Sequence, residues 1–142
     1  MDTPSMSLTP EQAKSESLRM QDELVALVPT EWISERRTQQ TAHLRQCAAD
    51  NLYSWSGFTG LSLNGTRDTD QLVTAVASAY SESAFTVTID KNPAGLRRVS
   101  LTGEDGANYL VAPGPKDQSG VSIYAGSPCF HLPDGMSPLD TF

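Results

Sequence analysis

The chain has 142 residues, a formal charge of −7 from 10 basic and 17 acidic side chains, and two cysteines. A chain of this length forms one domain that buries about 68–70% of its unfolded surface, without needing metals or crosslinks. The acidic balance excludes nucleic acids and anionic membrane surfaces as partners bound through bulk charge, and no apolar run approaches the roughly 20 residues that span a bilayer.

The two ends of the chain lack hydrophobic periodicity. Residues 1–8 are predicted to form a flexible N-terminal tether and residues 132–142 a flexible C-terminal tail, around a single domain at 9–131. The opening MDTPSMSLTP has no basic region, apolar stretch or cleavage site, so it is not expected to be a signal peptide. A chain trimmed behind a signal sequence would look identical.

A helix is predicted over residues 10–28. Thr9 is suited to cap it, Pro10 to occupy its first position, and Gln12 to complete a capping box. Residues recurring at helical spacing form one face: Ala13, Ser17, Met20, Leu24, Leu27 and Val28. Pro29 is expected to end the helix.

The next segment contains the clearest strand signal. Residues 30–46 sustain neither period and are predicted as a connection with a short extended piece near Ala42 to Cys47. In LYSWSGFTGLSL at 52–63, aromatic and apolar residues alternate with serines, which predicts a half-buried strand. Asn64-Gly65 then predicts a turn.

A second helix is predicted to begin at Asp68 or Thr69, and its apolar side carries Leu72, Val73, Val76, Ala79 and Tyr80. Period-two alternation then predicts four strands joined by turns, marked by Phe85 to Asp90, Val99 to Leu101, Tyr109 to Val111, and Val121 to Ala125. The prediction is an α+β, two-layer sandwich with two helices packed on one face of a mainly antiparallel sheet of about five strands.

The cysteines are the most informative pair. Cys47 precedes the aromatic strand and Cys129 follows the last strand, so a disulfide between them would close a loop of about 80 residues, in an oxidising compartment. The sequence favours this over two reduced, buried thiols. A third alternative is a Cys₂His₂ zinc site, because His43 and His131 adjoin the cysteines; the spacing does not match a zinc knuckle.

Catalytic patterns are weak. No serine lies in a Gly-x-Ser-x-Gly elbow, and the carboxylate pairs Glu16–Glu23 and Glu31–Glu35 are typical of solvated surfaces. We therefore expect no enzyme, no metal and no cofactor.

Aromatic and basic residues suggest two binding surfaces. Trp32, Tyr53, Trp55 and Phe85 could line an apolar groove, although core packing is the common use of such residues. Two arginine pairs, Arg36-Arg37 and Arg97-Arg98, could clamp an anionic partner, although solvated charges are more usual. The expected binding surface is the sheet face or edge around Trp55 and the loop 113–120.

The chain also resembles a family. Cys47 shortly before Tyr53-x-Trp55-x-Gly57, followed by a helix, a strand meander and Ser-Pro-Cys-Phe at 127–130, is similar to small actinobacterial cell-envelope lipoproteins such as the mycobacterial LppA-like group. The likeness covers roughly residues 10–131. It implies export, a Cys47–Cys129 disulfide, and attachment through a lipidated N-terminal cysteine that this chain lacks; it implies no enzymatic activity.

The expected function is that of an extracytoplasmic, monomeric binding module of the cell envelope, without catalysis. Its partner would be a protein or a small apolar ligand, not a nucleic acid, and a membrane only through a lipid anchor. One alternative is a small inhibitor or immunity-type protein with an acidic binding surface. Another is an unrecognised hydrolase.

Overall fold

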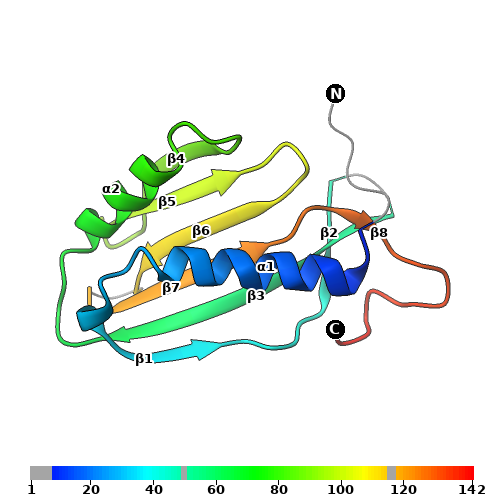
Figure 1. The fold of residues 1–142 in the computed structure, drawn as a ribbon, viewed down its shortest axis with the longest axis horizontal. Helices are drawn as coiled ribbons and strands as arrows, with labels where there is room; N and C mark the ends of the chain where they lie inside the picture. Colours follow the sequence, from blue (N-terminus) through cyan, green and yellow to red (C-terminus); the bar gives the residue numbers. More distant parts are fainter. Residues whose placement is uncertain (1–7, 49–50, 115–117) are drawn as a thin grey trace.

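The computed structural model describes residues 8–48, 51–114 and 118–142. Figure 1 shows two helices in front of an open antiparallel sheet, which makes the chain an α+β protein as predicted. Helix α1 (Pro10–Val25) contacts strands β3 and β7, and helix α2 (Thr69–Ala79) contacts β4, β5 and β6. Within the described residues, neither helix combines the length and apolar character needed to span a membrane.

Both helices begin at the caps that the sequence predicts. The N–H of Gln12 donates to the Thr9 hydroxyl at 3.0 Å while the N–H of Thr9 donates to the Gln12 side chain at 2.9 Å. This reciprocal pair satisfies donors that the first helical turn leaves free. Helix α2 is capped by the Asp68 carboxylate. Helix α1 ends at Val25 rather than at residue 28, because a tighter turn leads into Pro29.

The sheet has eight strands: β1 (Ile33–Thr38), β2 (Leu44–Gln46), β3 (Leu52–Leu63), β4 (Thr86–Lys91), β5 (Arg97–Thr102), β6 (Asn108–Pro113), β7 (Gly120–Gly126) and β8 (Phe130–His131). A short 3₁₀ turn, η1 (Thr30–Trp32), precedes β1. The main order is β1-β3-β7-β6-β5-β4, and β2 and β8 pair with the first residues of β3. Strands β4 to β7 form the predicted meander.

The predicted count of about five strands was too low. Strand β1 lies in the segment predicted as a connection; its residues Ser34 to Arg37 are exposed and polar, as is common at a sheet edge, so no apolar alternation marks it. Strand β2 lies in the predicted extended piece, and β8 has only two residues. The long strand β3 accommodates all three because each of its ends pairs with different neighbours.

The core beneath the helices consists of two apolar clusters. Pairing places Val87, Leu101, Tyr109 and Ala125 in one row across four strands, facing the helices. The larger cluster includes that row and the apolar sides of α1 and α2. The smaller cluster packs Ala13 from α1 against residues of the other end of the sheet: Ala42, Leu44, Trp55 and Phe130.

Residues 132–142, predicted as a flexible tail, make specific contacts with the domain. The N–H of Ala42 donates to the carbonyl of Phe142 at 2.9 Å, and the N–H of Phe142 donates back at 3.0 Å. Leu132 and Phe142 pack against the smaller cluster. In Figure 1 this red segment loops past β8 and returns beside the start of α1. The predicted domain boundary at residue 131 did not anticipate these contacts.

Candidate functional site

The four aromatic residues predicted to bind a ligand do not share one surface. Trp55 is fully buried in the smaller cluster, and Tyr53 packs against that cluster. Trp32 belongs to the larger cluster, where Phe85 makes edge contacts with two tyrosines. Trp32, Trp55 and Phe85 therefore pack in the core, which is the alternative that the sequence left open for them.

The predicted disulfide is confirmed. Cys47 and Cys129 are bonded, with 6.4 Å between their Cα atoms, and they tie the end of β2 to the segment before β8. Because both sulfurs are bonded to each other, neither is a thiolate ligand, and the Cys₂His₂ zinc alternative was wrong. His43 instead lies beside the carbonyl of Asp140, with its Nδ1 at 3.3 Å, and His131 pairs with Leu52 in the sheet.

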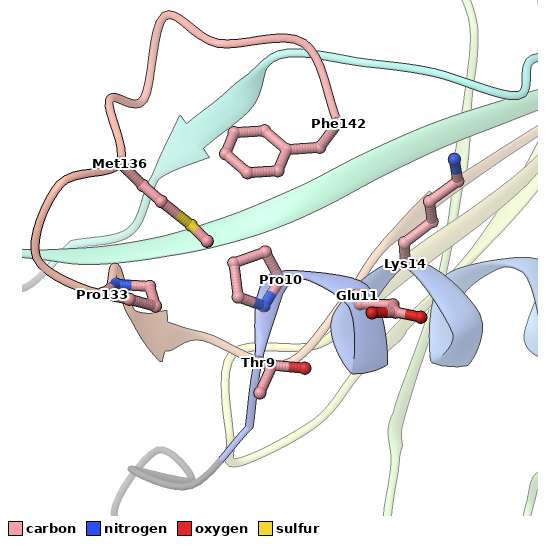
Figure 2. A pocket seen from close by; sticks show the side chains of 7 residues that line it. All are labelled: Thr9, Pro10, Glu11, Lys14, Pro133, Met136 and Phe142. Atoms are coloured by element: carbon pink, nitrogen blue, oxygen red, sulfur yellow. The ribbon is translucent and has the colours of Figure 1, made fainter.

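A groove lies between the start of α1 and the C-terminal segment, directly above the smaller cluster. It has a volume of about 500 Å³ and is lined by Thr9, Pro10, Glu11, Lys14, Pro133, Met136 and Phe142. Figure 2 shows the Met136 thioether, the Phe142 ring and the Pro10 ring converging on the same space. Met136 is 46% exposed, so an apolar wall faces solvent. We call this feature the terminal groove.

Trp55 contacts two of the residues that line the terminal groove, Phe142 and Lys14. Its indole N–H donates to the main-chain oxygen of Phe142 at 3.2 Å, which holds the last residue against the domain. The Lys14 ammonium lies 5.7 Å from the Trp55 ring centroid, within the range of a cation–π contact. Lys14 and Glu11 are the two ionisable side chains in the lining. The groove therefore combines apolar walls with charges of both signs at the helix end.

Sequence reasoning missed this groove because half of its walls come from the segment predicted as a tail. A signal was present, since residues 133–142 include Pro133, Met136, Leu139 and Phe142 at short intervals. Apolar residues at that density favour packing against a domain over a solvated tail.

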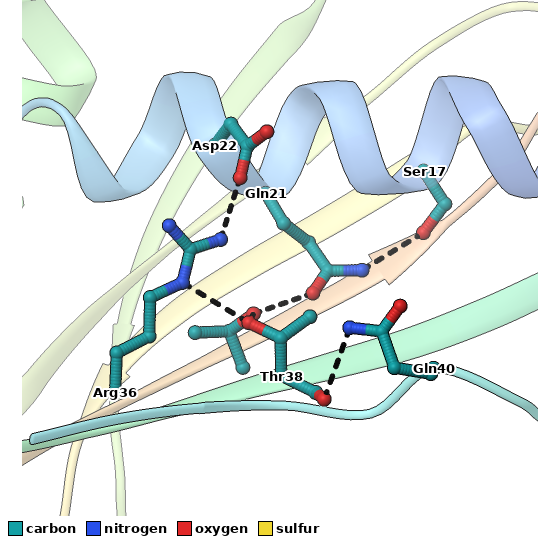
Figure 3. A network of polar contacts seen from close by, with 7 residues as sticks. Ser17, Gln21, Asp22, Arg36, Thr38 and Gln40 are labelled. Atoms are coloured by element: carbon teal, nitrogen blue, oxygen red, sulfur yellow. Dashed lines mark hydrogen bonds and ion pairs between the residues drawn. The ribbon is translucent and has the colours of Figure 1, made fainter.

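Figure 3 shows a chain of polar contacts between α1 and the sheet. Along α1, its residues Ser17 and Gln21 lie between Ala13 of the smaller cluster and Leu24 of the larger one. The Gln21 amide donates to the Ser17 hydroxyl at 3.1 Å, and Ser17 donates to the carbonyl of Ala125 at 2.7 Å. The Thr59 hydroxyl donates to the Gln21 carbonyl at 2.6 Å. Ser17, Gln21 and Thr59 are all fully buried. We refer to these contacts as the Gln21 chain.

The Gln21 chain continues to the surface. Thr59 has one hydroxyl proton, which Gln21 accepts, so Thr38 must donate in the 3.0 Å contact between the two threonine hydroxyls. Thr38 in turn accepts from Nε of Arg36 at 3.0 Å, and Arg36 pairs with Asp22 of α1 at 2.6 Å. Every buried polar atom named here has a partner, which is typical of a structural network that fixes how α1 sits on the sheet.

Two tyrosines between the helices have shifted pKa values. Burial, with the hydrogen bond that the Tyr80 phenol donates to Glu23, raises the pKa of Tyr80. Burial and the nearby negative charge of Glu16 raise the pKa of Tyr109. The hydrogen bond from Arg19 lowers the pKa of Glu16. A phenol with a raised pKa stays protonated at neutral pH, whereas a tyrosine that acts as a general base needs a lowered pKa.

Comparison with known proteins finds one solved structure with a similar fold. No protein-family model matches the chain, and no curated protein matches its sequence. A crystal structure of a DUF4853 family protein from Actinomyces odontolyticus ATCC 17982 is similar over 94% of this chain and 71% of that chain, with a TM-score of 0.53 and 13% sequence identity. At this identity the likeness shows the fold alone. The neighbour comes from an actinobacterium and belongs to a family of unknown function, and none of the comparisons points to the LppA-like group.

Proposed function

We propose that the chain is an extracytoplasmic, monomeric binding domain that acts without catalysis, and that its terminal groove takes a small apolar ligand. The groove itself is the observation that carries the proposal, because Pro10, Met136 and Phe142 present apolar surface to solvent around a volume of about 500 Å³. Ligand pockets in proteins are of this size and are lined mainly by apolar side chains.

The disulfide supports an extracytoplasmic location. A bond between Cys47 and Cys129 persists in an oxidising compartment and would be reduced in most cytosols. The resemblance of the sequence to actinobacterial lipoproteins implies the cell envelope, with a lipid anchor upstream of residue 9, and the fold neighbour also comes from an actinobacterium. The direct test is thiol trapping with a maleimide in the intact producing cell: no adduct is expected before reduction and two are expected after it. Adducts before reduction would place the chain in a reducing compartment.

A binding role also suits the chemistry of the groove. Its two ionisable side chains, Glu11 and Lys14, have opposite charges and come from the first turns of α1, while Pro10, Pro133, Met136 and Phe142 are apolar. Such a lining recognises a ligand by shape and apolar area, with the charges orienting its polar end.

The groove is tested with N-phenylnaphthylamine, a dye that fluoresces in apolar sites. We expect the dye to bind, and Met136→Asp to weaken its binding at least about tenfold, because an ionised side chain in the wall disfavours apolar contact. Leu139→Asp is the matched control: it lies in the same segment, is 82% exposed and does not line the groove. Equal dye affinity in the two variants, or no binding at all, would refute the groove as a ligand site.

A further inference from the structure

The face of the sheet opposite the helices carries a pair of aromatic rings, of which Tyr124 is exposed and Phe58 is half-buried. Pairing places Phe58 of β3 opposite Tyr124 of β7, and Tyr124 opposite Leu110 of β6. The Phe58 and Tyr124 ring centroids are 5.0 Å apart, and Tyr124 is 48% exposed. Because these rings face away from α1 and α2, they do not contribute to either apolar cluster beneath the helices.

Two hollows flank this ring pair, and Phe58 lines both. One, of about 300 Å³, is lined by Arg45 together with the amides of Gln39 and Asn108. The other, of about 380 Å³, is lined by Arg37 and several serines. Glycines keep both hollows open: a Cβ at Gly60 would lie 3.1 Å from the Phe58 ring, and one at Gly126 would lie 2.9 Å from the Asn108 amide.

Charge in the hollows is opposite to that of the whole chain. Among the described residues, each hollow is lined by one arginine and by no carboxylate, although the chain has 17 acidic residues. Arg45 has no ion-pair partner within the described ranges, whereas Arg37 pairs with Glu35 at 2.6 Å. That pair is exposed, with 57% and 62% of the side chains accessible, so it holds Arg37 only weakly. The hollows therefore complement a negatively charged ligand.

We propose that this face binds an acidic oligosaccharide. The C–H face of a sugar ring packs on an aromatic face, whose negative quadrupole attracts it, and Phe58 and Tyr124 provide such faces. Neutral amides and hydroxyls in the hollows match the hydroxyls at the sugar edge. The guanidinium of Arg45 matches a sugar carboxylate through charge-assisted hydrogen bonds.

An acidic peptide fits this face less well. Peptides that join sheets do so by pairing their main chain with an open strand edge. Strands β3, β7 and β6 each have neighbours on both sides, so the face around Phe58 and Tyr124 offers no such edge. The outer strands of the main order are β1 and β4. β1 lies beside β3 and contributes Arg37 to one hollow, but its unpaired edge is on the side away from β3.

The test is isothermal titration calorimetry of the full chain with hexamers of galacturonate, mannuronate and hyaluronan. At least one is expected to bind. Tyr124→Ala and Arg45→Gln should each weaken that binding about tenfold or more, and Arg45→Gln should also reduce its salt dependence. Both positions are exposed, so the variants are expected to fold, which circular dichroism checks. Ile89→Ala, a truncation of another exposed apolar side chain, is the control and should leave binding unchanged.

Several results would overturn the proposal. These are no binding of any of the three hexamers, binding that neither Tyr124→Ala nor Arg45→Gln affects, and equal binding of the neutral hexamer maltohexaose. A hexaglutamate peptide that bound as tightly as the best sugar would reassign the face to acidic peptides. The Met136→Asp variant separates the two sites, because it should impair dye binding in the terminal groove and leave sugar binding intact.

Discussion

The hydroxyl of Thr59 donates a 2.6 Å hydrogen bond to the side-chain carbonyl of Gln21, and both side chains are fully buried. This contact joins the middle of β3 to the middle of α1, at the boundary between the two apolar clusters. A buried polar pair at such a boundary is satisfied in one register of the helix on the sheet, and a shift of the helix along its axis would break it.

Removing the donor of this pair is therefore costly. We expect Thr59→Val, which keeps the shape of the side chain, to lower the free energy of unfolding by about 1–3 kcal/mol, because the Gln21 carbonyl is left buried without a partner. Urea denaturation measures the change. Thr88→Val, at an exposed position of β4, is the matched control and should change stability by less than about 0.5 kcal/mol.

The double variant Thr59→Val with Gln21→Leu separates a lost bond from an unsatisfied group. Its loss of stability should be smaller than the sum of the losses of the two single variants, because the donor and the acceptor are both removed and neither is left buried without a partner. Strictly additive losses would show that the two side chains act independently.

Gly106 is predicted to be intolerant of any side chain. Its φ is +91°, and a Cβ built on it would lie 2.3 Å from the Cys129 sulfur. Gly65 shares a positive φ of +79° but has nothing within 4 Å of its Cβ position. Gly65→Ala should cost about 1–2 kcal/mol from backbone strain alone, and Gly106→Ala about 1–3 kcal/mol more from the overlap.

Thermal unfolding compares the two alanine variants, with a second comparison in a Cys47→Ala/Cys129→Ala background. There the sulfur is gone, so the difference between Gly106→Ala and Gly65→Ala should shrink. If the difference persisted, the contact with the disulfide would not be its cause.

How far the sequence predicts this fold depends on whether each segment's own residues determine its structure. Helix α1 was predicted well because Thr9, Pro10 and Gln12 cap it locally and its apolar residues recur at helical spacing. Strand β3 was predicted to the residue because its aromatic alternation is strong. Strand β1 was missed because its six residues carry no apolar pattern, and because the residues it pairs with, Thr59 to Leu63, lie more than 20 positions further along the chain.

The candidate sites were harder to predict than the fold. Composition favoured the disulfide over reduced thiols or a zinc site, because two cysteines allow one pairing. It did not identify the terminal groove, which needs the C-terminal residues to fold back onto Pro10 and Trp55. Alternation along β3 places Phe58 and Trp55 on opposite faces of the sheet. The sequence does not show which of these faces the helices cover, because that depends on tertiary packing. In the structure Trp55 lies on the helix side and Phe58 on the helix-free face.

The raised pKa values of Tyr80 and Tyr109 predict a loss of stability at high pH. Both phenols have folded-state pKa values above the usual value of about 10, so the unfolded chain loses these protons first as the pH rises. Their contribution to stability is complete below pH 10 and declines above it, by at most about 1.4 kcal/mol per pH unit for each phenol. Urea denaturation between pH 9 and about 11.5 measures this slope. Tyr109→Phe should flatten the slope, and an unchanged slope would contradict the assignment to Tyr109.

The hydrogen bond from the Trp55 indole to the main-chain oxygen of Phe142 predicts different effects for two changes at the C-terminal segment. Deletion of residues 133–142 removes the acceptor and the packing of the Phe142 ring on the smaller cluster, so we expect a loss of about 1–3 kcal/mol or more in the free energy of unfolding. Water reaching the ring should also shift tryptophan emission to longer wavelength; Trp32 lies in the other cluster and serves as an internal reference.

Phe142→Ala keeps the main-chain acceptor and removes only the ring. It should therefore leave the emission maximum unchanged and cost less stability than the deletion, while weakening dye binding in the terminal groove, whose wall the ring forms. If the deletion changed neither stability nor emission, residues 133–142 would not be part of the folded domain. A red shift in Phe142→Ala equal to that of the deletion would show that the ring, and not the main-chain oxygen, shields Trp55.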